Sequence, residues 1–200
     1  ALLFCTACGS TRQAECVDVL SNTENSRYSF ELKYEDEKEL IAVTDKSSGE
    51  SFIIPEETFV DESYSIMSIY PTENYLYYMK GRNSGVSIYR IKLSDMTREE
   101  IIKSSDTADK SILGLTFSWS DTENRFSAVR LFTDEKNIYL IDKNGMVFVL
   151  NPFAEKITDC TCIIEESVLG GCIFDGKAIY YIDEDGVQKM YNVVNKTFRI

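Results

Sequence analysis

The sequence predicts an all-β protein, a β-propeller-like array of about four short blades, and three observations predict it. A repeated unit is clearest at Phe174–Ile200 and again at Thr133–Thr158, where a turn, a β-rich run, an Asn/Asp-Gly turn and two further runs follow one another. The runs are short and rich in β-branched and aromatic residues, which suit a pleated, half-buried surface. Tyr139 and Tyr180 align between the copies at a separation of about 41 residues, within the ~40–45 residues of a four-stranded propeller blade.

Glycine-containing turns define where each hairpin reverses. Asn144-Gly145 and Asp185-Gly186 follow the β-rich runs of the two copies, and they predict type I′ turns, because such turns need φ > 0 at both central residues. The same turns resemble fragments of a Ca²⁺-binding loop. A loop of the EF-hand kind also needs a bidentate Glu further along, and neither copy has one at that position. We therefore favour plain hairpin turns.

Two weaker copies of the unit precede the clear ones. Tyr28–Tyr34 alternates strictly, as a strand with one wet face does, and it opens a degenerate first unit. Tyr64–Ile102 is a better copy, in which Thr97–Glu100 either opens a helix through a capping box or forms the outer strand that the repeat predicts. The approximate units are residues 27–60, 63–105, 126–160 and 168–200, and an insertion covers about residues 106–125. Because insertions in repeat proteins lie in loops on one rim, we expect this one to lie there too.

The first ten residues carry a separate signal. An apolar run ends in Thr6-Ala7-Cys8, and small and polar residues follow. This pattern resembles the end of a bacterial lipoprotein signal peptide, and the resemblance makes Cys8 the lipidated residue. The alternative is a structural or metal-binding pair of Cys5 and Cys8, which lacks a second pair and any His to complete a site. The expected organisation is residues 1–8 as the signal-peptide end, 9–26 as a tether with a short strand at Cys16–Leu20, and 27–200 as the repeat domain.

Charge and composition exclude several functional classes. A net charge of −12 and a pI near 4.5 oppose binding to nucleic acid, which demands a basic surface, and to anionic lipid headgroups. The chain contains no histidine, which removes Ser-His-Asp and Cys-His catalysis and His-ligated zinc. The N-terminal apolar segment is too short to span a bilayer. We therefore expect an extracytoplasmic protein that is held to a bacterial membrane through its lipid anchor only.

Cysteines and carboxylates are the remaining candidates for chemistry. Cys172 can form a disulfide with Cys160 or Cys162 if the protein is exported, or these residues stay buried free thiols. A metal site of all three is a further alternative. Adjacent acids on a strand or turn point apart, whereas a glycosidase needs two carboxylates ~5–10 Å apart across a cleft. We therefore expect no catalytic, cofactor-binding or metal-binding residue, and we interpret the acidic groups as solvated turns: Glu35–Glu37, Glu56–Glu57, Asp61–Glu62 and Glu165–Glu166.

The units resemble blades of the low-density-lipoprotein-receptor type of β-propeller, which is named for a Tyr-Trp-Thr-Asp motif on the second strand. The corresponding segments are Tyr180–Asp183, Tyr139–Asp142 and Tyr77–Lys80, of which the last keeps the Tyr and loses the Asp, and none has the Trp. The closer resemblance is to bacterial lipoproteins of unknown function with such divergent blades. It implies a propeller with an interaction or sensing role, and it implies no reaction.

The expected function is therefore that of a non-enzymatic, surface-anchored binding or scaffold domain that recognises a protein, peptide or glycan on one rim. A second hypothesis is a carbohydrate-active propeller enzyme that works through carboxylates, which requires two facing acids in a cleft. A third is the extracellular sensor part of a longer signalling chain. No cofactor is expected under the first hypothesis.

Overall fold

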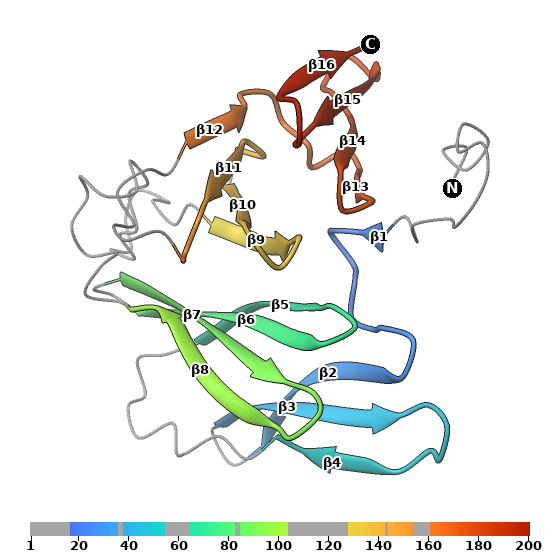
Figure 1. Cartoon of the computed structure of the whole chain (residues 1–200), viewed down its shortest axis with the longest axis vertical. Helices are drawn as coiled ribbons and strands as arrows, with labels where there is room; N and C mark the ends of the chain where they lie inside the picture. Colours follow the sequence, from blue (N-terminus) through green and yellow to red (C-terminus); the bar gives the residue numbers. More distant parts are fainter. Residues whose placement is uncertain are drawn as a thin grey trace.

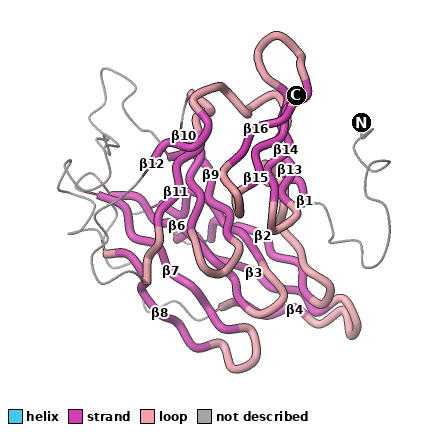
Figure 2. Tube along the Cα trace, turned by 45° about the horizontal axis from the view of Figure 1, so that its top comes forward, coloured by secondary structure: helices cyan, strands magenta, loops and turns pink. Residues whose placement is uncertain are grey.

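The fold is all-β throughout the part of the chain that the structure describes, as the sequence predicts. The computed structural model describes residues 17–35, 38–54, 65–82, 85–103, 128–142, 144–153 and 161–200. Figure 2 shows these residues as strands and loops. None of these residues forms a helix long and apolar enough to cross a membrane.

The strands form four antiparallel sheets that follow one another as blades 1 to 4 (Figure 1). Blade 1 contains β2 (Tyr28–Glu35), β3 (Lys38–Asp45) and β4 (Ser51–Ile53). Blade 2 contains β5 (Ser65–Pro71), β6 (Tyr75–Arg82), β7 (Gly85–Lys92) and β8 (Thr97–Ile102). Blade 3 contains β9 (Ala128–Thr133), β10 (Ile138–Asp142), β11 (Val147–Leu150) and β12 (Thr161–Ile164). Blade 4 contains β13 (Cys172–Phe174), β14 (Ala178–Ile182), β15 (Gln188–Asn192) and β16 (Thr197–Arg199). Thr97–Glu100 lies in β8, so it forms the outer strand and the helix alternative is wrong.

One type of turn opens the second strand of blades 2, 3 and 4, and the same turn opens β2. In each case a side-chain oxygen accepts the backbone N–H three residues further on, which is how Asx and Thr side chains hold a turn. The acceptor residues and distances are Asn25 (2.7 Å), Thr72 (3.1 Å), Asp134 (2.6 Å) and Asp175 (2.7 Å). β2 is therefore equivalent to the second strand of the other blades.

The predicted hairpins β10–β11 and β14–β15 are present, but their turns are not of the predicted type. The type I′ prediction is wrong because Gly145 and Gly186 have φ of +86° and +78°, while Asn144 and Asp185 do not have positive φ. Each hairpin instead closes through a three-residue loop that ends in a left-handed glycine, as in a G1 bulge. Asp142 Oδ1 accepts the backbone N–H groups of Asn144 at 2.9 Å and Met146 at 2.8 Å. Asp142, whose carboxylate could resemble a Ca²⁺ ligand, thus accepts hydrogen bonds from the main chain of its own turn.

The hydrophobic core lies between consecutive blades. Five residues after each turn residue, a ring on β2, β6 or β10 faces the following blade: Phe30, Tyr77 and Tyr139 are 3%, 0% and 2% exposed. Phe30 belongs to the cluster that joins blades 1 and 2, and the two tyrosines belong to the cluster that joins blades 2, 3 and 4. Burying such a side chain contributes about 1.5–3 kcal/mol. The stability of each blade therefore depends on its neighbour.

The segment that precedes β2 connects the two ends of the array. β1 (Val17–Asp18) adds a fifth strand to blade 4 by pairing with β13, and the Val19 N–H donates to the Cys172 carbonyl at 2.9 Å. The chain then passes blade 2, where Asn25 Nδ2 donates to the Thr72 carbonyl at 2.7 Å, and enters blade 1 (Figure 1). The sequence predicts residues 9–26 as a tether, and from residue 17 onward this stretch is part of the packed fold.

Candidate functional site

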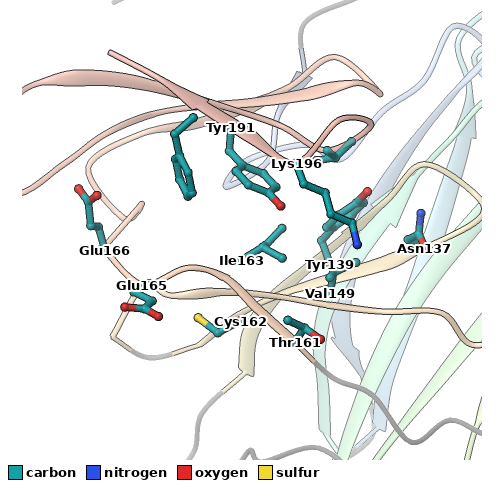
Figure 3. Close-up of a pocket in the computed structure, with 12 residues that line it drawn as sticks. Asn137, Tyr139, Val149, Thr161, Cys162, Ile163, Glu165, Glu166, Tyr191 and Lys196 are labelled. Carbon is teal, nitrogen blue, oxygen red and sulfur yellow. The ribbon is translucent and has the colours of Figure 1, made fainter.

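A groove of about 650 Å³ separates the outer strands of blade 3 from those of blade 4 (Figure 3). Blade 3 contributes one wall through β10, β11 and β12, and blade 4 contributes the other through β15, β16 and the turn between them. The lining residues are Asn137, Tyr139, Val149, Thr161, Cys162, Ile163, Glu165, Glu166, Tyr191, Val193, Lys196 and Phe198. The groove exists because the two blades pack closely at their inner strands and leave space at their outer ones.

Three aromatic rings form the apolar part of this groove. Strand register places them there, since Tyr139 is paired with Val149 across β10–β11, and Tyr191 is paired with Phe198 across β15–β16. Tyr139 and Tyr191 are buried, whereas Phe198 is 55% exposed. The Tyr191 and Phe198 rings lie 4.7 Å apart between centroids at 55°. A half-exposed aromatic ring beside a buried one offers a ligand apolar area that is only partly shielded from water.

The tyrosine hydroxyls are poor acids in this environment. Burial raises the pKa of Tyr139. The negative charge of the nearby Asp134 carboxylate, which accepts a 3.0 Å hydrogen bond from the Tyr139 hydroxyl, raises this pKa further. Burial also raises the pKa of Tyr191. Both side chains are therefore neutral at physiological pH, and they act as walls and hydrogen-bonding groups.

The two ends of the groove carry opposite charges. Lys196 lies at one end near Asn137, and Glu165 and Glu166 lie at the other end (Figure 3). Glu166 forms an ion pair with Lys189, which also contacts Asp183 at 2.8 Å. Among the described residues, neither Lys196 nor Glu165 takes part in an ion pair, so one cation and one anion face the groove without a partner of opposite charge.

The cysteines predicted as disulfide candidates lie near this groove without a bond. Cys162 lines the groove, Cys172 is a buried residue of β13 in blade 4, and both are free thiols. A disulfide between these two is therefore not formed. Burial raises the pKa of the Cys172 thiol to about 12, and burial followed by the charge of Glu165 raises the pKa of Cys162. Cys160 and the predicted lipidation residue Cys8 lie outside the described residues.

Carboxylates in the described part of the chain form no metal cluster, since no three His, Cys, Asp or Glu side chains there are grouped to hold an ion. Glu165 and Glu166 are exposed on the connector that follows β12 and are consecutive in sequence. The other acidic pairs, except for the backbone of Glu35, lie outside the described residues.

Sequence reasoning missed Lys196 and Phe198 as groove residues. A usable signal is the repeated third turn of the blades, Asp95-Met96-Thr97 in blade 2 and Asn195-Lys196-Thr197 in blade 4. In both turns the central residue is left-handed, with φ of 58° at Met96 and 55° at Lys196. The Thr hydroxyl donates to the Asp or Asn side chain at 2.6 Å in each. Aligning these turns would have placed Lys196 at the rim and Phe198 on the outer strand.

Comparisons with known proteins find similarity to solved structures. No protein-family model matches it, and no curated protein matches it significantly. Similar solved structures include a chain of a nidogen–laminin complex, at 13% identity and a TM-score of 0.48, with 87% of this chain and 58% of that chain covered. The tricorn protease gives 10% identity, a TM-score of 0.42 and coverage of 89% and 18%. TolB from Acinetobacter baumannii gives 13% identity, a TM-score of 0.40 and coverage of 86% and 51%. The chain thus spans less than two thirds of each of these proteins.

Proposed function

We propose that this chain is a non-enzymatic binding or scaffold domain and that the groove between blades 3 and 4 receives an extended peptide segment of a partner protein. The observation that carries the proposal is the order of groups along the groove. A cation, an aromatic stretch and an anion follow one another between Lys196 and Glu165. Ligand sites of this kind combine an apolar lining with a few convergent polar groups that fix the orientation.

The chemistry of the groove favours a peptide with charged residues. A basic side chain at one end of the ligand pairs with Glu165, an acidic side chain at the other end pairs with Lys196, and an apolar side chain between them covers Phe198. Partly desolvated charge pairs give orientation and specificity, while a buried aromatic contact gives most of the affinity. A neutral glycan would use the rings and leave both charges without a partner.

The location that we propose is outside the cytoplasm, through lipidation of Cys8. The motif that ends at Cys8 supports this proposal. Expression of the protein with its natural leader in a bacterial host, followed by intact-mass measurement, tests it. We expect a diacylglycerol-sized mass gain that Cys8→Ser abolishes. A product with no lipid mass would remove the proposal.

Selection of displayed peptides on the purified chain tests the groove. We expect binders with an acidic residue, an apolar residue and a basic residue in an extended order, and we expect Phe198→Ser to weaken them about 30-fold, the loss typical of a hot-spot residue. Val194→Ser is the matched control, because Val194 is 73% exposed on the same blade and does not line the groove. Binders that Phe198→Ser and Val194→Ser weaken equally, or a failure to obtain any binder, would contradict the proposal.

A further inference from the structure

The groove between blades 3 and 4 continues past Glu165 and Glu166 into a depression of about 550 Å³. These two residues line both the groove and the depression, and Figure 3 shows them at the opposite end of the groove from Lys196. The depression lies at one rim of the two blades. It is bounded by Asn144 in the β10–β11 turn and by Asp185 in the β14–β15 turn. A ligand that lies along the groove therefore reaches this depression at its basic end.

The depression is strongly acidic, because five carboxylates and the single ammonium group of Lys189 line it. Lys189 pairs with Glu166 and, at 2.8 Å, with Asp183. Asp183 also accepts two backbone N–H groups of its own turn. The other three carboxylates are exposed and take part in no ion pair with a described residue: Glu165, Glu184 and Asp185. A ligand thus meets three negative charges that the described part of the chain leaves unbalanced.

A buried tyrosine hydroxyl next to the depression has no hydrogen-bond partner among the described residues. Tyr181 is 0% exposed, and strand register places it opposite Lys189 across β14–β15. Burial raises the pKa of Tyr181, and the charges of Glu166, Lys189 and Asp183 also act on it. Because these three residues all line the depression, the hydroxyl points toward it. A buried polar group without a partner is costly, so a ligand that supplies one gains binding energy.

We propose that the depression binds an arginine of the partner peptide, in addition to the basic residue that pairs with Glu165. This inference rests on the proposed function of the groove. A guanidinium has five N–H donors and no acceptor, which matches three carboxylates and a hydroxyl oxygen. The flexible stem of Lys189 swings aside to admit it to Tyr181. No three carboxylates of the described residues are grouped to hold a metal ion, which favours an organic cation.

The spacing of the two basic residues follows from the extended peptide. Side chains of residues i and i+2 point to the same side of a strand. The arginine therefore lies two positions beyond the residue that pairs with Glu165. The partner class is thus a segment in which an acidic residue, an apolar residue and two spaced basic residues follow one another.

Calorimetry with a peptide selected on the groove and cut after its first basic residue tests this inference. The peptide is compared with three versions extended at that end by Ser-Arg, Ser-Gln or Ser-Glu. We expect Ser-Arg to tighten binding about tenfold, the gain from one hydrogen-bonded charge pair. Ser-Gln should change the affinity little, and Ser-Glu should weaken it.

Two variants of blade 4 locate the gain. Glu184→Lys combined with Asp185→Asn gives the turn the residues that blade 3 has at the same place, so the fold tolerates it, and it should abolish the gain from Ser-Arg. Tyr181→Phe should reduce the gain about threefold, whereas Tyr77→Phe in blade 2 should not. Glu31→Lys combined with Glu50→Gln on blade 1 changes the net charge equally and is the control for long-range charge.

The outcomes separate this inference from the proposed function. A Ser-Arg peptide that binds no tighter than the cut peptide would overturn the arginine site, as would a gain that persists in either blade 4 variant. A gain that the blade 1 control abolishes equally would overturn it too. In each case, binding of the cut peptide and its loss with Phe198→Ser leave the groove itself supported. If no version of the peptide binds, the proposed function and the arginine site both fail.

Discussion

Gly145 and Gly186 occupy the same position in the hairpin turns of blades 3 and 4, but their surroundings differ. Both are left-handed, with φ of +86° and +78°. A Cβ on Gly145 would lie 2.3 Å from Ser167 Oγ and 2.8 Å from Ser167 Cα, whereas a Cβ on Gly186 would meet nothing within 4 Å. The Gly145 carbonyl also accepts the Val168 N–H at 3.0 Å. The connector between blades 3 and 4 thus packs directly against Gly145 through Ser167 and Val168.

Alanine at the two positions should therefore cost different amounts of stability. Both variants bear the left-handed penalty of about 1–2 kcal/mol, and both gain the same reduction of chain entropy in the unfolded state. Gly145→Ala adds an overpacking cost of about 1–3 kcal/mol, because the Ser167 Oγ can rotate away from the new Cβ but the Ser167 Cα, which is backbone, cannot. The difference between the variants isolates the contact with Ser167.

Urea unfolding followed by circular dichroism measures this difference. With an m value of about 2 kcal/mol/M, the midpoint of Gly145→Ala should lie about 0.5–1.5 M below that of Gly186→Ala. Adding Ser167→Gly removes the Oγ contact and should recover part of the difference, while the 2.8 Å approach to Cα remains. Equal midpoints for the two alanine variants would refute the packing of this turn on the connector.

Three further predictions concern hydroxyls, carboxylates and thiols. Tyr139→Phe loses the 3.0 Å bond to Asp134 and should lower the free energy of unfolding by about 1 kcal/mol; Tyr181→Phe should be neutral or stabilising in the same urea assay, because its buried hydroxyl has no partner among the described residues. Hydrogen bonds from Ser47 lower the pKa of Asp45 from 3.8 to about 2, so its stabilisation is present above pH 3.8 and is lost as the pH falls toward 2; Asp45→Asn should flatten the fall of the urea midpoint in that window, and an unchanged slope would contradict the assignment. Alkylation followed by mass spectrometry should label Cys162 in the folded protein and Cys172 only after unfolding, since Cys172 is 1% exposed with a pKa of about 12; equal native rates would contradict its burial.

The sequence predicted the blades because their signals are local. Short β-branched and aromatic runs bounded by Asx and glycine turns are determined within about ten residues, as at Asp134 to Asn144, where both turn carboxylates bind the neighbouring main chain. The type of turn was not predictable from Asn-Gly alone. Here Asp142 accepts two backbone N–H groups and draws the turn into a longer loop with one left-handed residue.

The groove between blades 3 and 4 and the pairing of β1 with blade 4 were not predictable, because both depend on residues far apart in sequence. Val17 and Phe174 pair across the whole array, and nothing in a two-residue strand indicates its partner. Tyr139 and Phe198 line one groove only because blades 3 and 4 pack at their inner strands. Periodicity shows that Phe198 lies on a strand, but it does not show that the strand edge leaves the ring 55% exposed.

A charge exchange between the groove and its ligand is the most direct test of the binding function. The measurement is the calorimetric dissociation constant of one selected peptide, and of the same peptide with its acidic residue changed to Lys, for the natural chain and for Lys196→Glu. We expect Lys196→Glu to weaken the original peptide and to bind the altered peptide more tightly than the natural chain does. If the substitution changes the affinity of both peptides in the same direction, Lys196 does not pair with the ligand, and the groove is not the binding site.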